Sequence, residues 1–359
     1  MTTIKEIASE AGVSISTVSY VLNHPDRTDK ASKETRKRIL ETARKYRYKP
    51  NVMGRGLRTG RSFTVGILGQ LGLYDSNIGN TIYGASEILR SAGYNLELTQ
   101  TGRMWQLNDR IPLEADHDSP AQYRRKLAEA VERLLTRGVD GILLAEVVTE
   151  QNMDLFLDLA ERIPMVKVFA PSGCPEIPSV YVDPAQIGVL AAEHLWELGH
   201  RHILILGGRA GAEANIVDCW KKAGAENLVK RLPDCRSFED GREVLRRILQ
   251  EMPEVTGIFA YNDNNAAGIL YEAQRMGICI PEQLSVIGVN NIELSERVYP
   301  RLTTVELPAI RQGEAAGELL IALMKGKSAT DSILSPRLIR RESSGTVRLT
   351  GKLKMEKKK

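Results

Sequence analysis

The stretch TIKEIASEAGVSISTVSYVLN, residues 3–23, decides how the start of the chain folds. Thr3 and Glu6 have the spacing of a capping box, which predicts a first helix. Gly12 favours a turn because glycine adopts positive φ without steric cost. Ser14 is suited to cap a second helix. The stretch therefore predicts two short helices joined by a tight turn.

The second of these helices has one apolar face and one mixed face. Val18, Val21 and Leu22 recur at helical spacing and predict its buried side. The other face carries small polar residues with one apolar and one aromatic side chain: Ile15, Ser16, Ser19, Tyr20 and Asn23. Such a face suits base edges in the major groove of DNA, where the second helix of a helix-turn-helix docks. An ordinary helical hairpin is the alternative interpretation.

A third helix is expected from about Lys33 to Tyr46, with Ser32 as its cap. We expect Tyr46 to pack on the first two helices and Arg36 to join a basic outer face. Residues 1–61 carry 14 lysines and arginines against 6 acidic residues, whereas residues 62–347 carry 29 against 38. A basic head on an acidic body predicts a polyanionic partner for the head alone.

Several classes of protein are disfavoured. The four cysteines form no C-x-x-C pair, which argues against a zinc site or a disulfide framework and is typical of a reducing cytoplasm. We find no signal peptide and no apolar run long enough for a membrane span, so we expect a cytoplasmic protein without a membrane partner. No catalytic arrangement stands out. We therefore expect no enzyme activity, no cofactor and no metal.

The N-terminal motifs resemble the lactose-repressor/galactose-repressor family of transcription regulators. The resemblance rests on residues 3–23, on S-x-x-T-R at 32–36, and on YKPN and GLRTGRS at 48–51 and 56–62. It implies a helix-turn-helix head at 1–49 and a hinge at 50–61. The residues implied or proposed for contact with DNA are Thr3, Ile15, Ser16, Thr17, Tyr20, Asn23, Tyr48, Asn51, Arg55 and Leu57.

Leu57 matches the leucine that two subunits wedge into the minor groove, which kinks the duplex. Gly54 and Gly56 would each cost a hinge helix about 1 kcal/mol relative to alanine. We therefore expect the hinge to be unfolded without DNA and helical on a cognate site.

Alternating strands and helices follow from residue 62 onward, which predicts parallel sheets covered by helices. Expected strands lie at 64–69, 94–99, 139–145, 164–169, 178–183, 202–208, 257–263, 284–291 and 302–307. Two such halves look like the type-1 periplasmic-binding-protein fold that this family uses as its sensor. The resemblance therefore predicts an α/β fold class, with an effector-binding and dimerisation body at 62–347. We expect lobe one at 62–170 and 302–328, lobe two at 171–301 and 329–347, and a disordered basic tail at 348–359.

Ligands of open α/β sheets bind outside the carboxyl ends of the strands, so residues at the strand ends are candidates for an interlobe pocket. These candidates are Tyr74, Asn77, Glu146, Phe169, Asp183, Arg236, Tyr261, Asp263 and Asn290. Polar groups with a few aromatics suit a sugar-like effector. The alternative at each position is a local cap or turn.

Some residues depart from the family pattern. Ile216 stands where sugar-sensing relatives carry an arginine, Arg236 stands where they carry a stacking aromatic, and Asn290 replaces their aspartate. Residues 100–120 look inserted. We therefore expect Arg236 to supply a cation to an unusual effector.

The sequence predicts a transcription regulator that represses as a homodimer on a near-palindromic double-stranded operator. A small molecule, which we expect to be a carbohydrate, would control it. The alternative is an effector-independent regulator with a degenerate pocket.

Overall fold

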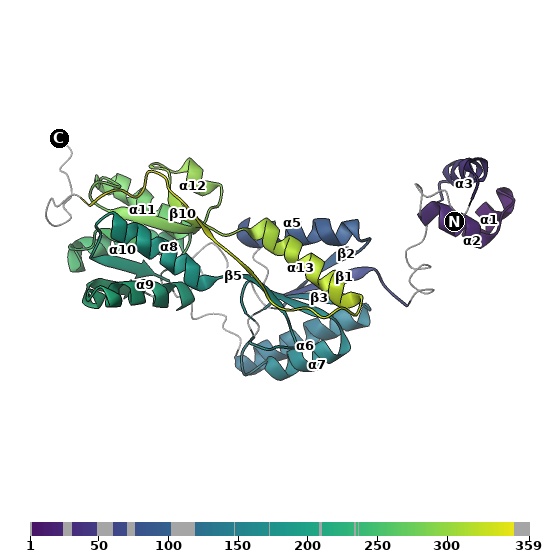
Figure 1. Cartoon of the computed structure of the whole chain (residues 1–359), viewed down its shortest axis with the longest axis horizontal. Helices are drawn as coiled ribbons and strands as arrows, with labels where there is room; N and C mark the ends of the chain where they lie inside the picture. The colour runs from purple at the N-terminus through teal and green to yellow at the C-terminus, as the bar shows by residue number, and fades with distance from the viewer. Residues whose placement is uncertain are drawn as a thin grey trace. The chain divides into compact units, whose positions relative to one another are not determined.

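The computed structural model describes residues 2–23, 31–48, 60–69, 76–101, 119–146, 148–171, 173–207, 210–232, 235 and 237–347. The chain divides into two compact units: Met1–Thr64 with Leu135–Asp140, and Val65–Leu134 with Gly141–Lys359. The first unit contains the helical head, and the second contains two six-stranded sheets with their helices (Figure 1).

Three helices form the head: α1 (Ile4–Glu10), α2 (Ile15–Asn23) and α3 (Lys33–Lys45). Each begins as the sequence predicts. The capping box of Thr3 and Glu6 is present, Ser14 Oγ accepts from Thr17 N, and Ser32 Oγ accepts from Thr35 N. The core consists of buried side chains from all three helices: Ile7, Ala8, Ala11, Val18, Val21 and Ile39. The predicted inward face of α2 is therefore confirmed, since Val18 and Val21 are buried and Leu22 packs against the core.

The first sheet has the strand order β11-β5-β4-β3-β1-β2. Its strands are β1 (Thr64–Gly69), β2 (Asn95–Gln100), β3 (Gly141–Ala145), β4 (Met165–Val168), β5 (Ser179–Val182) and β11 (Ser332–Leu334). The helices of this lobe are α5 (Ser76–Ser91), α6 (Pro120–Thr136), α7 (Met153–Arg162) and α13 (Ala309–Met324). In Figure 1, α5 and α13 lie on one face of the sheet, and α6 and α7 lie on the other.

The second sheet has the strand order β12-β10-β9-β8-β6-β7. Its strands are β6 (Ile203–Leu206), β7 (Val229–Leu232), β8 (Gly257–Phe259), β9 (Ser285–Asn290), β10 (Thr303–Glu306) and β12 (Arg337–Ile339). The accompanying helices are α8 (Pro184–Glu197), α9 (Ala210–Lys222), η1 (Glu226–Leu228), α10 (Phe238–Glu251), α11 (Asp263–Met276) and α12 (Leu294–Arg297). All pairings are parallel except that of β12 with β10.

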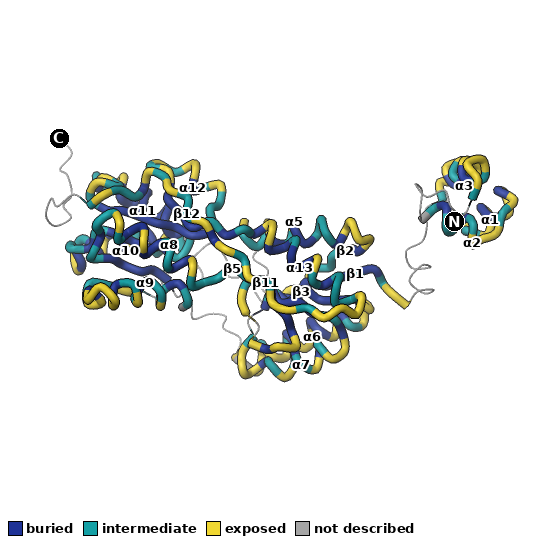
Figure 2. The backbone as a smooth tube through the Cα atoms, viewed as in Figure 1, coloured by how far each residue is buried: buried dark blue, intermediate teal, exposed yellow. Residues whose placement is uncertain are grey.

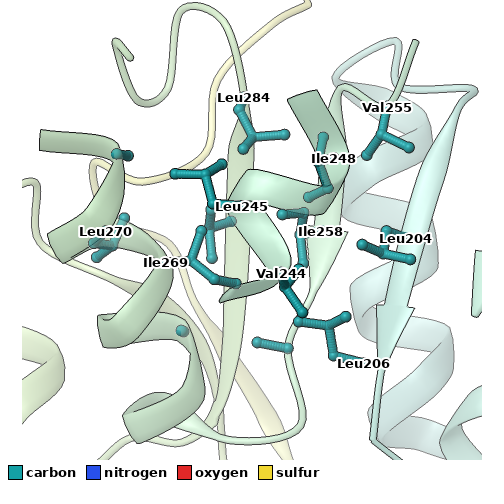
Figure 3. Close-up of a cluster of buried hydrophobic side chains, with 14 of the residues drawn as sticks. Leu204, Leu206, Val244, Leu245, Ile248, Val255, Ile258, Ile269, Leu270 and Leu284 are labelled. Atoms are coloured by element: carbon teal, nitrogen blue, oxygen red, sulfur yellow. The ribbon is translucent and has the colours of Figure 1, made fainter. Parts of the chain in front are cut away.

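Alternation along the strands divides the core of the second lobe into two layers. Leu204 and Leu206 pack with α10 and α11 in the cluster shown in Figure 3. Ile203 and Ile205 face the other side and join the cluster formed by α8 and α9. Buried strands between partly exposed helices are also visible in Figure 2. The sheet is therefore covered on both faces, as the continuous apolar runs predicted.

Three strands lie in a different lobe from the one we predicted. We expected 329–347 to belong to lobe two, but β11 pairs in parallel with β5 in the first sheet. We expected 178–183 to open lobe two, but β5 pairs in parallel with β4 in the first sheet. We expected 302–307 to return to lobe one, but β10 pairs with β9 in the second sheet. The chain crosses between sheets after each of these strands. An apolar run in the sequence predicts a strand, but it does not show which of the two sheets that strand joins.

No helix in the described part of the chain has both the length and the apolar character needed to cross a bilayer.

Candidate functional site

The second helix of the head presents the face that the sequence predicted for base contact. Ile15 is 44% exposed although it is a large apolar residue, and Ser16 beside it is exposed. Ser14 Oγ lies 2.7 Å from Ser16 Oγ and 2.8 Å from Thr17 Oγ1. Tyr20 follows on the same face and is half-buried. The start of α2 therefore carries an outward apolar contact among short hydroxyl side chains.

The end of α3 differs from our prediction. Tyr46 is exposed and its hydroxyl donates a 3.0 Å hydrogen bond to Glu10, which also pairs with Lys45 at 2.8 Å. These contacts lower the pKa of Glu10, mainly through the Lys45 hydrogen bond. Arg47 has a φ of 49°, and Tyr48 packs against the head core, where burial raises the pKa of its hydroxyl. Just beyond α3, Arg47 lies in the left-handed region, and Tyr48 rather than Tyr46 packs against the head core.

The basic side chains of α3 also divide into two groups. Arg36 is buried, contrary to the outer position that we predicted. The exposed basic side chains at this helix and just beyond it are Lys33, Lys37, Arg38, Arg44, Lys45 and Arg47. Exposed cations near a recognition helix can neutralise phosphates.

In the first sheet, the candidate residues do lie at the carboxyl ends of strands. Glu146 follows β3, Phe169 follows β4, and Asp183 follows β5. Glu146 is buried and accepts a hydrogen bond from the hydroxyl of Thr101, which follows β2. Asp183 Oδ1 accepts from Ala185 N at 2.8 Å, which makes it the N-cap of α8. Asn77 lies in the first turn of α5.

In the second sheet, Tyr261 and Asn290 lie at adjacent strand ends and are partly exposed. Asp263, which we predicted as an effector contact, is 0% exposed. Its Oδ1 accepts from Thr304 Oγ1 at 2.6 Å and its Oδ2 accepts from Ile292 N at 2.8 Å. Burial raises the pKa of Asp263 to about 6. Asp263 therefore supports the strand ends from inside the lobe.

The backbone is unusual at the same edges. Phe169, Asn290 and Asn291 have φ values of 77°, 113° and 55°. Residues other than glycine reach this region at a cost of about 1–3 kcal/mol and tend to do so at functional sites. The strand ends of both sheets therefore combine polar side chains with strained backbone.

An arginine that we did not predict, with a side chain only 8% exposed, holds one of these turns. Arg341 Nη2 donates to Asn291 Oδ1 at 2.7 Å, and Nη1 donates to the carbonyl oxygen of Leu302 at 2.9 Å. Asn291 Nδ2 donates to Glu306 Oε1 at 2.8 Å. Arg341 is remote in sequence from these partners, so no local motif identified it.

Comparisons with known proteins agree with both units. Residues 3–51 match bacterial regulatory proteins of the lacI family, and residues 192–344 match a periplasmic binding protein-like domain. The HTH-type transcriptional repressor PurR of Vibrio cholerae serotype O1 is 30% identical over 355 residues, which span 96% of this chain and 98% of that protein. The chain belongs to the lacI family of bacterial regulatory proteins. It is thus a DNA-binding transcriptional regulator, and the family and fold class that we predicted are confirmed.

Other relatives show the same span. Catabolite control protein A of Priestia megaterium is 29% identical over 348 residues, covering 92% of this chain and 95% of that protein. A crystal structure of the lac repressor dimer bound to operator and the anti-inducer ONPF matches with a TM-score of 0.78 at 20% identity, covering 96% and 99% of the two chains. At that identity the match concerns the fold alone.

Some predicted site residues lie outside the described residues: Asn51, Arg55, Leu57, Tyr74 and Arg236. The side chain of Asn23 is likewise not described. Their roles, and the hinge that contains the first three, remain predictions. Ile216, which replaces the arginine of sugar-sensing relatives, is 0% exposed in the core of the second lobe. Among described residues, no group of three or more His, Cys, Asp or Glu side chains is arranged to hold a metal ion.

Proposed function

We propose that this protein represses transcription by binding a near-palindromic operator as a homodimer, and that a small molecule controls its affinity for DNA. The observation that carries the proposal is the exposed face of α2, with Ile15 beside Ser16 on a buried three-helix core. Two copies related by a two-fold axis would read two half-sites. The relatives named above include a repressor.

Within this proposal, the head residues have separate roles. Ile15 contacts a thymine methyl group, and Ser16 and Tyr20 donate or accept hydrogen bonds at neighbouring base edges. Thr3, Thr17, Asn23 and Tyr48 contact the DNA backbone or support those contacts. Asn51, Arg55 and Leu57 bind through the hinge, where Leu57 enters the minor groove.

A patch on the first lobe supports the dimer. We call it the first-lobe apolar patch: Tyr83 on α5, Leu98 on β2 and Ile310 on α13, which are 56%, 45% and 44% exposed. Helix α5 packs against both β2 and α13, so the three residues lie on neighbouring elements. Exposed apolar patches commonly mark interfaces. The lac repressor neighbour is itself described as a dimer on its operator.

The strand ends support the control by a small molecule. Asn77, Glu146, Phe169 and Asp183 follow strands of the first sheet, and Tyr261 and Asn290 follow strands of the second. Ligands of α/β sheets bind at such ends. We propose a hydroxyl-rich, sugar-like effector, with Arg236 as a further contact. The buried Ile216 favours the second candidate, a regulator that needs no effector, because the arginine of sugar sensors is replaced by a core residue.

A selection of bound DNA from a random duplex pool tests the proposal, with the full-length protein. We expect a near-palindrome with two equal half-sites. Enrichment of a single asymmetric half-site would contradict dimeric reading. The selected duplex then serves to screen sugars and other metabolites for release or gain of binding. If no metabolite changes the affinity, the effector-independent candidate replaces the controlled one.

A further inference from the structure

A buried ammonium group lies near the carboxyl edge of the first sheet. Lys167 is the third residue of β4 and is only 3% exposed. Its Nζ donates a 2.9 Å hydrogen bond to the carbonyl oxygen of Glu146. Lys167 pairs in register with Leu144, so Glu146 lies two residues further toward the strand ends. At about 3.3 Å per residue, the side chain extends along the sheet toward the edge where α/β proteins bind ligands.

The charge of Lys167 is incompletely matched. An ammonium has three donors, and this is the one hydrogen bond that Lys167 makes within the described part of the chain. No carboxylate of a described residue forms an ion pair with it. The carboxylate of Glu146 interacts with the Lys167 ammonium by charge attraction alone. Glu146 Oε2 instead accepts a hydrogen bond from the hydroxyl of Thr101. Burial outweighs that attraction and lowers the pKa of Lys167 to about 8.

A structural role explains this arrangement poorly. Buried charges are normally paired, because removing an unpaired ammonium from water is costly. One hydrogen bond to a carbonyl oxygen offsets little of that cost, and a methionine of similar length would fill the same space without a charge. A group that destabilises the free protein is typical of a site that is completed by a ligand.

We propose that Lys167 binds an anionic oxygen, from a carboxylate or a phosphate group, on the small molecule that enters at the carboxyl edge of the first sheet. The proposal rests on the proposed control by a small molecule and specifies its chemistry as an acid. An anion would supply the missing counter-charge and would accept hydrogen bonds from the two remaining N–H groups of Lys167. A neutral sugar would leave the charge unmatched.

The stability of variants gives the first test. We compare thermal unfolding of the full-length protein with Lys167→Met and with Lys222→Met, an exposed lysine in the last turn of α9 that controls for the lost charge. Without ligand, Lys167→Met should raise the Tm by about 2–4 °C, and Lys222→Met should leave it unchanged. A lower Tm for Lys167→Met would overturn the proposal, because Lys167 would then be a structural donor.

Anion titration gives the second test. Sodium phosphate and sodium acetate are each exchanged for sodium chloride at constant ionic strength. At least one should raise the Tm of the wild type and Lys222→Met while leaving Lys167→Met unchanged, since a ligand stabilises only the state that binds it. The anion that raises the Tm more shows whether the site prefers a phosphate or a carboxylate group. Equal effects on the wild type and Lys167→Met would overturn the proposal.

Affinity for the selected duplex, measured on the same preparations, separates the two proposals. Wild type that fails to bind DNA contradicts the proposed function, whereas the Tm comparisons still decide the role of Lys167.

Discussion

At the first position of α11, Asp263 keeps a carboxyl group inside the second lobe, where it accepts from Thr304 and Ile292. Because burial raises its pKa to about 6, the folded protein retains a proton between pH 4 and 6 that the unfolded chain releases. This group therefore makes the free energy of unfolding decrease as pH rises through that window and stay level above it.

Asp263→Asn should remove this dependence, because an amide does not titrate there. The stability of the wild type relative to Asp263→Asn should fall by about 2 kcal/mol between pH 4 and 7, at 1.36 kcal/mol per pKa unit. Denaturant unfolding at several pH values measures it. Asp218→Asn, at an exposed position of α9, is the control. If the free energy of unfolding of the wild type and of Asp263→Asn changed equally with pH, Asp263 would not be the group that titrates.

The sequence predicted the role of a residue correctly where that role depends on near neighbours in the chain. The caps at Thr3, Ser14 and Ser32 depend on neighbours three residues away, so spacing was sufficient. The burial of Arg36 and Asp263 depends on packing between distant segments, which spacing does not encode.

At the scale of elements, helix pairs approach closely through glycines. A Cβ at Gly313 of α13 would overlap the carbonyl oxygen of Thr81 on α5, and a Cβ at Gly84 would overlap that of Ile310. Gly313→Ala should therefore push the two helices apart and lower the free energy of unfolding by about 1–3 kcal/mol or more. Glu318→Ala on the exposed face of α13 should cost under about 1 kcal/mol. Urea unfolding compares them; equal stabilities would show that the crossing tolerates a methyl group.

The elements that we failed to predict have weak local patterns. Strand β7 has the sequence VKRL at the edge of its sheet, with its two central residues exposed. Helix α9 has a mixed composition, and neither it nor β7 is among the elements that we predicted. By contrast, central strands such as β1 and β9 are continuous apolar runs, which identified them from sequence.

At the scale of the whole molecule, the sequence predicted two lobes but assigned β5, β10 and β11 to the wrong ones. Adjacency in the sheet is set by long-range pairing, and the chain crosses between lobes after each of these strands. Assembly into a homodimer also belongs to this scale, because two heads are needed to read the two half-sites of a near-palindrome.

Tyr83→Glu should weaken the proposed homodimer, because it places a charge in the first-lobe apolar patch. Sedimentation at micromolar concentration should show a shift toward monomer, and affinity for the selected duplex should fall with it. Ile333→Glu, on the exposed edge strand β11, should change neither. An unchanged dimer for Tyr83→Glu would exclude this patch as the interface.

The affinity of Ile15→Ala for the selected duplex tests the central claim most directly, since no other described residue of α2 is both large, apolar and exposed. The homodimer loses one base contact in each half-site, at about 1–3 kcal/mol each. Binding should therefore weaken by about 30-fold or more, and preference should relax at one position of each half-site. Glu41→Ala, on the exposed side of α3, should bind like the wild type. Wild-type affinity and sequence preference for Ile15→Ala would contradict base reading by α2.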